Sequence, residues 1–338
     1  MVMNATPIPA LQDVVGQSDA FLSFQERLSR AAGIDRPVLI IGERGTGKEL
    51  AAARLHYLSP RWQGPYVPLN CAAMPGSLLD SELFGHEAGA FTGAISRRKG
   101  YFERADNGTL FLDEIANLDQ QAQAKLLRVA EYGTFDRVGG SSPVEVNVRL
   151  IGATNANLPQ LAREGKFKED LLDRLSFEVL AIPPLRQREG DVDLLVHHFA
   201  TRMAVNMGLD VRPEFSTQAM SALRSHRWPG NVRELRNVVE RAVYRANGHT
   251  VTSIDFNPFG SDLQPTPSGN PEIQEAQATP ACAVDLGVPL PEAVRNLEDA
   301  YLQIALERSR YNQKKAAGLM GLTYHQFRSL YRRLKREK

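Results

Sequence analysis

Cysteine and long apolar runs are both scarce in this 338-residue chain. The two cysteines, Cys71 and Cys282, have neither a Cys-x-x-Cys spacing nor a metal-ligand spacing, which favours a reducing compartment over a disulfide framework. No apolar run has the length that spans a bilayer, and residues 1–10 lack the basic and apolar segments of a secretory signal. We therefore expect a cytoplasmic protein without membrane insertion.

Net charge is also small, at +1, but it is unevenly distributed. Residues 308–338 carry ten Lys and Arg and one acidic residue, so the preceding 307 residues carry 30 basic and 38 acidic groups. A basic end on an acidic body suggests that only the end meets nucleic acid.

A phosphate-binding loop follows a short apolar strand. Val38–Ile41 reads as a buried strand, and the next residues fit G-x-x-x-x-G-K. Glycines let backbone N–H groups converge on an anion, and Lys48 would reach the β- and γ-phosphates. The candidate nucleotide-binding residues are Gly42, Glu43, Arg44, Gly45, Thr46, Gly47, Lys48 and Glu49. The alternative is an ordinary strand–turn–helix with a surface lysine.

Glu49 stands where this motif usually has a Ser or Thr that holds Mg²⁺, so the metal must depend on another carboxylate and on water. Asp113 and Glu114 close a second apolar strand that begins at Gly108. Asp113 is the candidate Mg²⁺ ligand, and Glu114 is placed to polarise an attacking water as general base. The alternative is that the two carboxylates only cap the next helix.

The order of the segments predicts an α/β fold with a parallel sheet and helices on both faces. Strands are expected at 38–41, 66–71, 108–114, 146–155 and 177–182, and ligands should bind at their carboxyl ends. We place an α/β subdomain at 13–180, an α-helical subdomain at 181–258, a flexible linker at 259–291 and a separate all-α domain at 292–338. Residues 258–291 hold seven of the 20 prolines, which supports the linker.

The basic end has the pattern of a helix–turn–helix. Ala317 and Gly321 have the spacing that close helix packing and a turn require, and Thr323 with Gln326 suggests a capping box. The second helix mixes residues able to read base edges with residues able to touch phosphates. The candidate DNA contacts are Thr323, Tyr324, His325, Gln326, Arg328 and Arg332. The alternative is a basic helical hairpin that contacts protein.

Four motifs together resemble a known family. GERGTGKE at 42–49, GAFTGA at 89–94, GTLFLDE at 108–114 and WPGNVREL at 228–235 are similar to bacterial enhancer-binding proteins. These are AAA+ ATPases that activate sigma-54-dependent RNA polymerase, and the C-terminal end resembles their Fis-like domain. The resemblance covers about 13–259 and resumes at the C-terminus. Glu49 is usual in that family, whereas Arg44 is less usual than a small residue.

The resemblance implies a function, cofactors and partners. The protein would bind ATP and Mg²⁺, assemble as a hexameric ring, bind double-stranded enhancer DNA and remodel the closed promoter complex into the open one. The leading helix of the C-terminal domain would support a dimer. Since no N-terminal regulatory domain is evident, a negative regulator is expected to act in trans.

The resemblance also assigns individual residues. Asn70 would hold Glu114 away from water until the γ-phosphate changes the hydrogen bonding. Thr154 and Asn155 correspond to the first nucleotide sensor and Arg233 to the second. Arg174 matches an arginine finger that reaches a neighbouring subunit's nucleotide. Lys168 stands where a second finger arginine is usual, and lysine supplies the charge without the bidentate fork. For both cations the alternative is an internal salt bridge.

The GAFTGA loop would carry the specific function. Its residues Gly89, Ala90, Phe91, Thr92, Gly93 and Ala94 surround one aromatic ring and one hydroxyl with small side chains. In the family this loop contacts sigma-54 when ATP is bound, and the helix with Leu83 to Gly85 would transmit hydrolysis to it. The alternative from composition is a turn with Phe91 in the core.

Three functional classes compete at this point. A nucleotide-driven transcription activator uses every motif. An AAA+ unfoldase or helicase loader explains Lys48 and Glu114 but leaves the GAFTGA loop and the basic end unused. A helix–turn–helix repressor with a regulatory nucleotide site leaves Glu114, Asn70 and Arg174 unexplained as a hydrolytic set.

Overall fold

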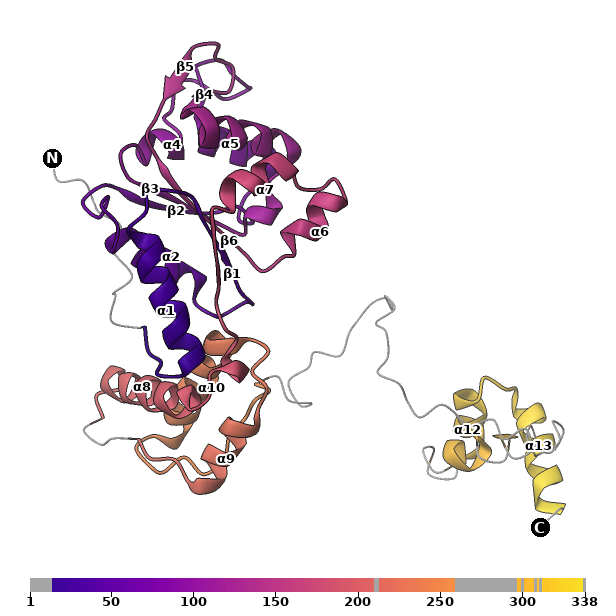
Figure 1. Cartoon of the computed structure of the whole chain (residues 1–338). Coiled ribbons are helices and arrows are strands. Elements are labelled where there is room, and N and C mark those ends of the chain that lie inside the picture. Colours follow the sequence, from indigo (N-terminus) through magenta and orange to yellow (C-terminus); the bar gives the residue numbers. More distant parts are fainter. Residues whose placement is uncertain are drawn as a thin grey trace. The chain divides into compact units, whose positions relative to one another are not determined.

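The computed structural model describes residues 14–209, 213–258, 297–298, 301–306, 309 and 312–336. The chain divides near residue 262 into two compact units, which are described separately (Figure 1). The predicted linker at 259–291 lies outside the described residues, as do parts of the helix expected from residue 297 to residue 308. Within the described ranges, no helix is both long and apolar enough to cross a bilayer.

A five-stranded parallel sheet organises the first unit, as predicted. Its strands follow the order β2-β3-β6-β1-β7. Their bounds are Val38–Ile41 for β1, Tyr66–Asn70 for β2, Thr109–Asp113 for β3, Arg149–Thr154 for β6 and Glu178–Ala181 for β7. The register pairs Asn70 with Asp113 and Ile41 with Thr154, so the polar residues that end these strands share one edge of the sheet.

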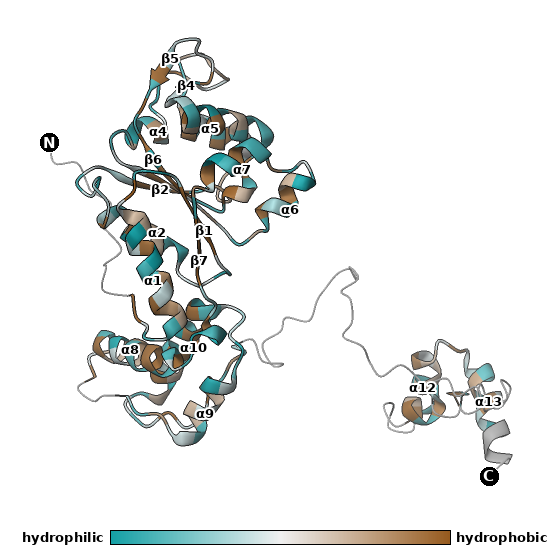
Figure 2. Cartoon of the chain, in the orientation of Figure 1, coloured by the Kyte–Doolittle hydropathy of each residue, from teal (hydrophilic) through white to brown (hydrophobic). Residues whose placement is uncertain are grey.

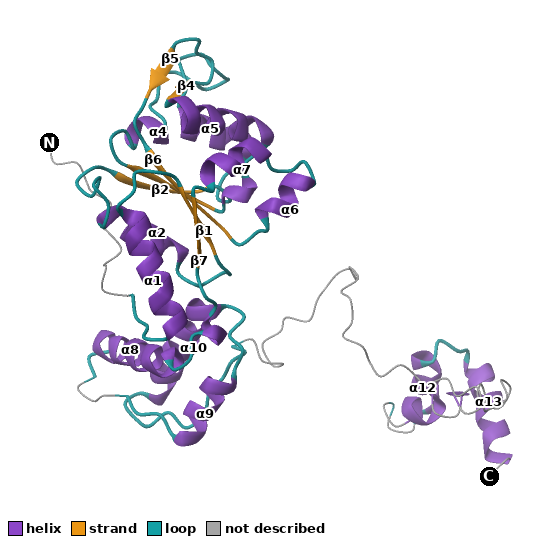
Figure 3. Ribbon diagram, in the orientation of Figure 1, coloured by secondary structure: helices purple, strands orange, loops and turns teal. Residues whose placement is uncertain are grey.

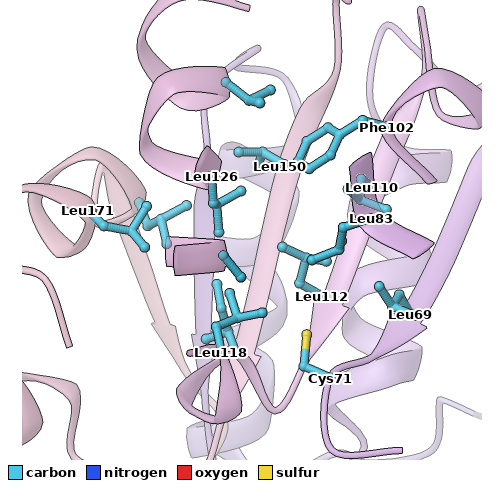
Figure 4. Close-up of a cluster of buried hydrophobic side chains, with 14 of the residues drawn as sticks. Leu69, Cys71, Leu83, Phe102, Leu110, Leu112, Leu118, Leu126, Leu150 and Leu171 are labelled. Atoms are coloured by element: carbon cyan, nitrogen blue, oxygen red, sulfur yellow. The ribbon is translucent and has the colours of Figure 1, made fainter. Parts of the chain in front are cut away.

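Alternation along the strands explains why helices cover both faces. Val38 and Ile40 pack toward α1 and α2, whereas Leu39 packs toward the opposite layer. The first layer is α1 (Asp19–Ala32) and α2 (Lys48–Tyr57); the second includes α3 (Gly76–Phe84), α4 (Tyr101–Arg104), α5 (Gln120–Tyr132), α6 (Leu158–Arg163) and α7 (Glu169–Leu175) (Figure 3). Figure 4 shows part of this second cluster of buried side chains. The strands are the most hydrophobic part of the unit (Figure 2).

Some local details differ from the predictions or were not predicted. Helix α3 ends at Phe84, because Gly85 adopts a left-handed φ of +73°. The strand expected from Val146 begins at Arg149. A two-stranded antiparallel ribbon, β4 (Thr134–Asp136) with β5 (Pro143–Glu145), was not predicted, since strands of three residues carry almost no periodic signal.

The helical subdomain is built of helices, as predicted. The short helix η3 (Leu185–Gln187) leads into α8 (Asp191–Asn206), α9 (Thr217–Ser225) and α10 (Asn231–Ala246). They enclose a separate apolar cluster in which Trp228 is 1% exposed. The Trp228 indole donates to the carbonyl oxygen of Leu223 at 3.0 Å, so this large side chain is buried without leaving its N–H unpaired.

The C-terminal unit is a helix–turn–helix, as predicted. Helix α12 (Gln313–Leu319) leads into a turn at Gly321, whose φ is +65°, and then into α13 (Tyr324–Arg336). The capping box is present: the Thr323 backbone N–H donates to Gln326 Oε1 at 3.0 Å, and the Gln326 N–H donates to Thr323 Oγ1 at 3.4 Å. Ala316, Ala317 and Phe327 form the buried inner face.

Candidate active site and recognition loop

The phosphate-binding loop has the geometry that its glycines predicted. It runs from the end of β1 to the start of α2, and Gly45 and Gly47 have φ angles of +76° and +97°. A Cβ at Gly45 would collide with the carbonyl oxygen of Gly230, so this glycine is also required by a close approach of the helical subdomain. Lys48 opens α2, is 8% exposed, and donates from Nζ to the Gly42 carbonyl oxygen at 3.1 Å.

A cavity of about 770 Å³ lies over this loop, a volume within the usual range of ligand sites. The α/β subdomain and the helical subdomain both line it. The predicted site residues on its wall are Arg44, Gly45, Thr46, Gly47, Lys48, Glu49, Asn70, Asp113, Glu114, Asn155 and Arg233. The fold therefore brings most of the predicted nucleotide-binding and catalytic side chains to one place.

The two carboxylates at the end of β3 occupy different backbone environments. Asp113 has ordinary strand geometry, whereas Glu114 has a φ of +53°, which is uncommon for a residue with a side chain. The Glu114 N–H donates to Asp113 Oδ1 at 3.0 Å. One carboxylate beside phosphate groups is a normal protein contribution to a Mg²⁺ site, so Asp113 fits the predicted metal role.

Asn70 lies beside this pair but is bonded elsewhere. Its Oδ1 accepts from the Ala72 N–H at 2.8 Å, and among the hydrogen bonds of the described residues none joins Asn70 to Glu114. The predicted switch between these two side chains stays a prediction. Cys71, the next residue, is 2% exposed, and burial raises the pKa of its thiol to about 12.

The sensor residues take different positions. Thr154 is fully buried, and its Oγ1 accepts from the Ala156 N–H at 3.0 Å, which shapes the turn after β6. Asn155 lines the cavity itself. Arg233 lines it from α10, and its backbone N–H donates to the Gly45 carbonyl oxygen at 3.3 Å.

Glu43 faces the helical subdomain instead of the cavity. Arg186 binds it with two hydrogen bonds of 2.6 and 2.8 Å, and Asn231 Nδ2 donates to Glu43 Oε2 at 3.1 Å. These bonds, Arg186 first and then Asn231, lower the pKa of the Glu43 carboxyl from 4.5 to about 2. Asn231 is fully buried and also donates to the Arg44 carbonyl oxygen at 3.0 Å. The phosphate loop is thus tied directly to the start of α10.

One end of the cavity was missed by sequence reasoning. Val14, Val15, Phe21, Phe24, Leu195 and Phe199 give it an apolar wall. Arg188 and Asp191, 3% and 1% exposed at the side chain, form a buried ion pair of 2.7 Å. Asp191 Oδ1 also accepts from the Gln17 N–H at 2.6 Å, which joins the segment before α1 to α8. The two sides of this wall come from segments more than 170 residues apart, so no local motif marked it.

The two candidate fingers lie at the start of α7 and within it, outside the cavity of their own chain. The Arg174 side chain is 58% exposed, and its Nε donates to Glu131 Oε1 at 2.8 Å. Lys168 precedes the helix, and its backbone N–H donates to Gln123 Oε1 at 2.8 Å. Neither residue lines the cavity.

The GAFTGA loop is a tight turn with an exposed ring. The Gly89 N–H donates to the Ala94 carbonyl oxygen at 2.8 Å, and the Gly89 and Gly93 φ angles are +81° and +104°. Phe91 is 43% exposed, so the alternative with this ring in the core is wrong. The ring makes an edge-on contact with His86, with 5.0 Å between ring centroids.

The predicted DNA contacts share the surface of the C-terminal unit. Thr323, Tyr324, His325, Gln326, Arg328 and Arg332 are all exposed. Phe327, between them in sequence, is fully buried, which fixes the opposite face of α13 against α12.

A phosphate loop, a carboxylate pair and a helical lid around one cavity define an AAA+ ATPase. Residues 14–181 match the family described as "Sigma-54 interaction domain", residues 186–271 the "AAA+ ATPase lid domain", and residues 293–336 "Bacterial regulatory protein, Fis family". The chain belongs to the family of sigma-54-dependent transcriptional activators.

Individual relatives agree with this assignment. The chain is 52% identical to the Psp operon transcriptional activator of Escherichia coli over 95% of its own length and 97% of that protein. It is 44% identical to the Nif-specific regulatory protein of Azotobacter vinelandii, over 93% of its own length and 57% of that protein. Among solved structures, NtrX from Brucella abortus in complex with ATP has a TM-score of 0.67 and 34% identity, over 96% of this chain and 69% of that one.

Proposed function

We propose that this protein activates a phage-shock-type (psp) operon by coupling ATP hydrolysis in a hexameric ring to remodelling of the closed sigma-54 RNA polymerase–promoter complex into the open complex. The observation that carries the proposal is the combination, in one unit, of a hydrolytic site with a GAFTGA loop that exposes Phe91. An unfoldase or helicase loader would not need this loop, and a simple repressor would not need the hydrolytic set. The 52% identity to the Psp operon activator supports the choice of operon.

The chemistry follows from the positions of the side chains. Lys48 and the N–H groups of the loop bind the β- and γ-phosphates of ATP. Asp113 would hold Mg²⁺, which neutralises charge on the phosphate oxygens. Glu114 polarises the attacking water as general base. Arg233 and Asn155 line the same cavity and would report on the γ-phosphate from the lid and the sheet.

Arg174 is proposed to complete the site of a neighbouring subunit. It is exposed and lies outside the cavity of its own chain, as a residue that acts in trans must. Mixing Arg174→Ala with Glu114→Gln protein tests this, because some interfaces of a mixed ring combine an intact Glu114 with an intact Arg174. Two inactive proteins should then regain ATP turnover. No gain on mixing would place Arg174 in cis, and Lys168→Ala measured beside it shows whether that lysine matters.

Phe91 is proposed to contact sigma-54. The test is binding of purified protein to sigma-54 with and without ADP–aluminium fluoride, together with open-complex formation. Phe91→Ala should keep ATPase activity and lose both binding and activation. Ile95→Ala is the matched control, since Ile95 is 93% exposed immediately after the loop. Nucleotide-dependent binding of sigma-54 by Phe91→Ala would refute the contact. If the wild type hydrolyses ATP but does not bind sigma-54, the protein would instead be an unfoldase.

The C-terminal unit is proposed to bind enhancer DNA as a dimer. Three large apolar side chains of the partly described first helix are exposed, namely Leu297 (51%), Tyr301 (62%) and Ile304 (52%). They follow an i, i+4, i+7 spacing, whereas Leu302 and Ala305 are buried. A second copy of this stripe would cover it. Ile304→Asp should weaken self-association in analytical ultracentrifugation and enhancer footprints, and removal of residues 292–338 should abolish footprints without affecting hydrolysis.

A negative regulator of the phage-shock type is proposed to bind the AAA+ surface in trans. The two tryptophans differ sharply: Trp228 is buried, whereas Trp62 is 56% exposed, and Leu58 on the same segment is 49% exposed. Arg61 fixes this segment by hydrogen bonds to Asp35 and Asn147. An exposed, well-supported tryptophan suits a protein contact. Trp62→Ala should make activation insensitive to the regulator while ATP turnover persists. If the regulator inhibits Trp62→Ala as strongly as the wild type, Trp62 is not part of the contact.

A further inference from the structure

The GAFTGA loop stands on a rigid base. His86 and Arg98 exchange two backbone hydrogen bonds of 3.1 and 3.0 Å, and Val138 donates to the Gly85 carbonyl oxygen at 2.9 Å. A Cβ on Gly85 would lie 2.5 Å from the Arg98 carbonyl oxygen, so the backbone before the loop and the backbone after it approach each other closely. A Cβ at Gly89 or at Gly93 would meet nothing within 4 Å, whereas a Cβ at Gly139 would lie 2.6 Å from the Cβ of Ala90.

His86 connects this base to the exposed ring of the loop. Its side chain is buried, with 8% exposure, and Nδ1 lies 2.9 Å from Ser81 Oγ on α3. The opposite contact is with Phe91, whose ring meets the imidazole edge-on at 63°. One imidazole therefore touches both α3 and the side chain proposed to contact sigma-54.

Helix α3 shares a buried cluster with the sequence neighbours of the proposed hydrolytic residues. Leu79 and Leu83 of α3 belong to the same buried cluster as Cys71 and Ile115. Cys71 follows Asn70 and Ile115 follows Glu114, so both neighbours of the catalytic pair pack in the cluster that holds α3 (Figure 4 labels Cys71 and Leu83). Because protein interiors are close-packed, a shift at these strand ends would be transmitted through this cluster to α3.

We propose that His86 is a positioning residue that carries a movement of α3 to Phe91. The Ser81 hydroxyl fixes the plane of the imidazole, and the edge-on contact fixes the direction of the Phe91 ring. His86 does not line the nucleotide-binding cavity. The inference rests on the proposed contact between Phe91 and sigma-54.

A double-mutant cycle tests the connection. Ser81→Ala removes the hydroxyl, and His86→Phe keeps a ring against Phe91 while removing Nδ1. Each change should weaken sigma-54 binding in ADP–aluminium fluoride about tenfold, equivalent to ~1.4 kcal/mol, with ATP turnover unchanged. The double variant should be no weaker than either single variant, because both remove the same bond. Ser225→Ala is the control, a helical serine of the lid whose hydroxyl binds a backbone carbonyl.

Every outcome decides between the alternatives. Additive effects in the double variant, or wild-type binding by Ser81→Ala, would overturn the role of His86. If His86→Phe fails to fold, the binding of sigma-54 by Ser81→Ala tests the proposal by itself. Ser81 is only half-buried, so its substitution should be tolerated by the fold. Phe91→Ala is measured in the same series. Full binding by Phe91→Ala means that the proposed function of the loop fails, whereas loss in Phe91→Ala with normal binding in both other variants means that only this inference fails.

Discussion

The ATPase unit buries its apolar side chains in clusters on both faces of a sheet, whereas the described part of the helix–turn–helix unit has one small cluster. In the first unit the functional side chains stand at strand ends and helix starts that this core holds in place. In the second they stand on the exposed face of one helix, and Phe327 is the largest side chain beneath them.

This difference in core size has a functional consequence. A small unit buries a small fraction of its surface and is only marginally stable by itself. The exposed apolar side chains of Leu297, Tyr301 and Ile304 would add buried area on dimerisation, so stability and DNA binding would be coupled in the C-terminal unit. The ATPase unit needs no such partner to form its cavity, although hydrolysis is expected to need a neighbour's Arg174. The following experiments separate the two units, from the largest expected effect to the smallest.

The largest effect is expected in the ATPase unit alone. Glu114→Gln removes the proposed general base and should lower the rate of ATP hydrolysis by roughly 10²–10⁴-fold. ATP binding and enhancer binding should be retained, because the change is nearly isosteric and the proposed DNA contacts lie in the other unit. Turnover assays, nucleotide titration and footprinting check this, with Glu145→Gln on exposed β5 as control. Loss of DNA binding would show that the units are not independent.

The next effect is confined to the small core. Phe327→Ala should lower the free energy of unfolding of the C-terminal unit by about 3–5 kcal/mol, which is comparable to the whole stability of so small a unit. We expect enhancer binding to disappear and ATP turnover to persist, with loss of the C-terminal transition in calorimetry. Leu319→Ala is the control, because Leu319 is 62% exposed on the adjacent helix. An intact transition in Phe327→Ala would mean that something other than this core stabilises the unit.

A smaller effect is expected at the start of α13. Thr323→Ala removes one side of the capping box and should destabilise the C-terminal unit by about 1 kcal/mol. Its thermal transition should shift down while the transition of the ATPase unit stays in place. Ser329→Ala, on the exposed face of the same helix, should leave both transitions unchanged. An equal shift in both variants would argue against the cap.

The smallest effect concerns the link between the phosphate loop and the lid. Since the pKa of Glu43 in the folded protein is about 2, below its ordinary 4.5, its pairing with Arg186 and Asn231 stabilises the fold fully above pH 4.5. This contribution is lost as the pH falls toward 2. Glu43→Gln lacks it at every pH, so its melting temperature should lie below the wild type at pH 7 and converge with it in acid. A difference in melting temperature that stays the same at every pH would contradict a stabilising role of the ionised Glu43 carboxylate.

The sequence by itself determined the features that depend on neighbouring residues. The phosphate loop, the carboxylates after β3, the capping box at Thr323 and the lid helices all follow from local patterns of glycine, charge and apolar spacing. Even the meeting of Asn70 with Asp113 could be foreseen, because parallel strands align their carboxyl ends.

Only the tertiary structure decided which distant groups complete these local features. The apolar wall of the cavity brings Phe21 together with Phe199, and Arg186 binds Glu43, although no periodic pattern in the sequence relates these residues. The contact of Phe91 with His86 depends on the orientation of the Phe91 ring. The physical reason is that packing and hydrogen-bond geometry depend on side-chain positions in three dimensions, which a pattern along the chain does not specify for distant segments.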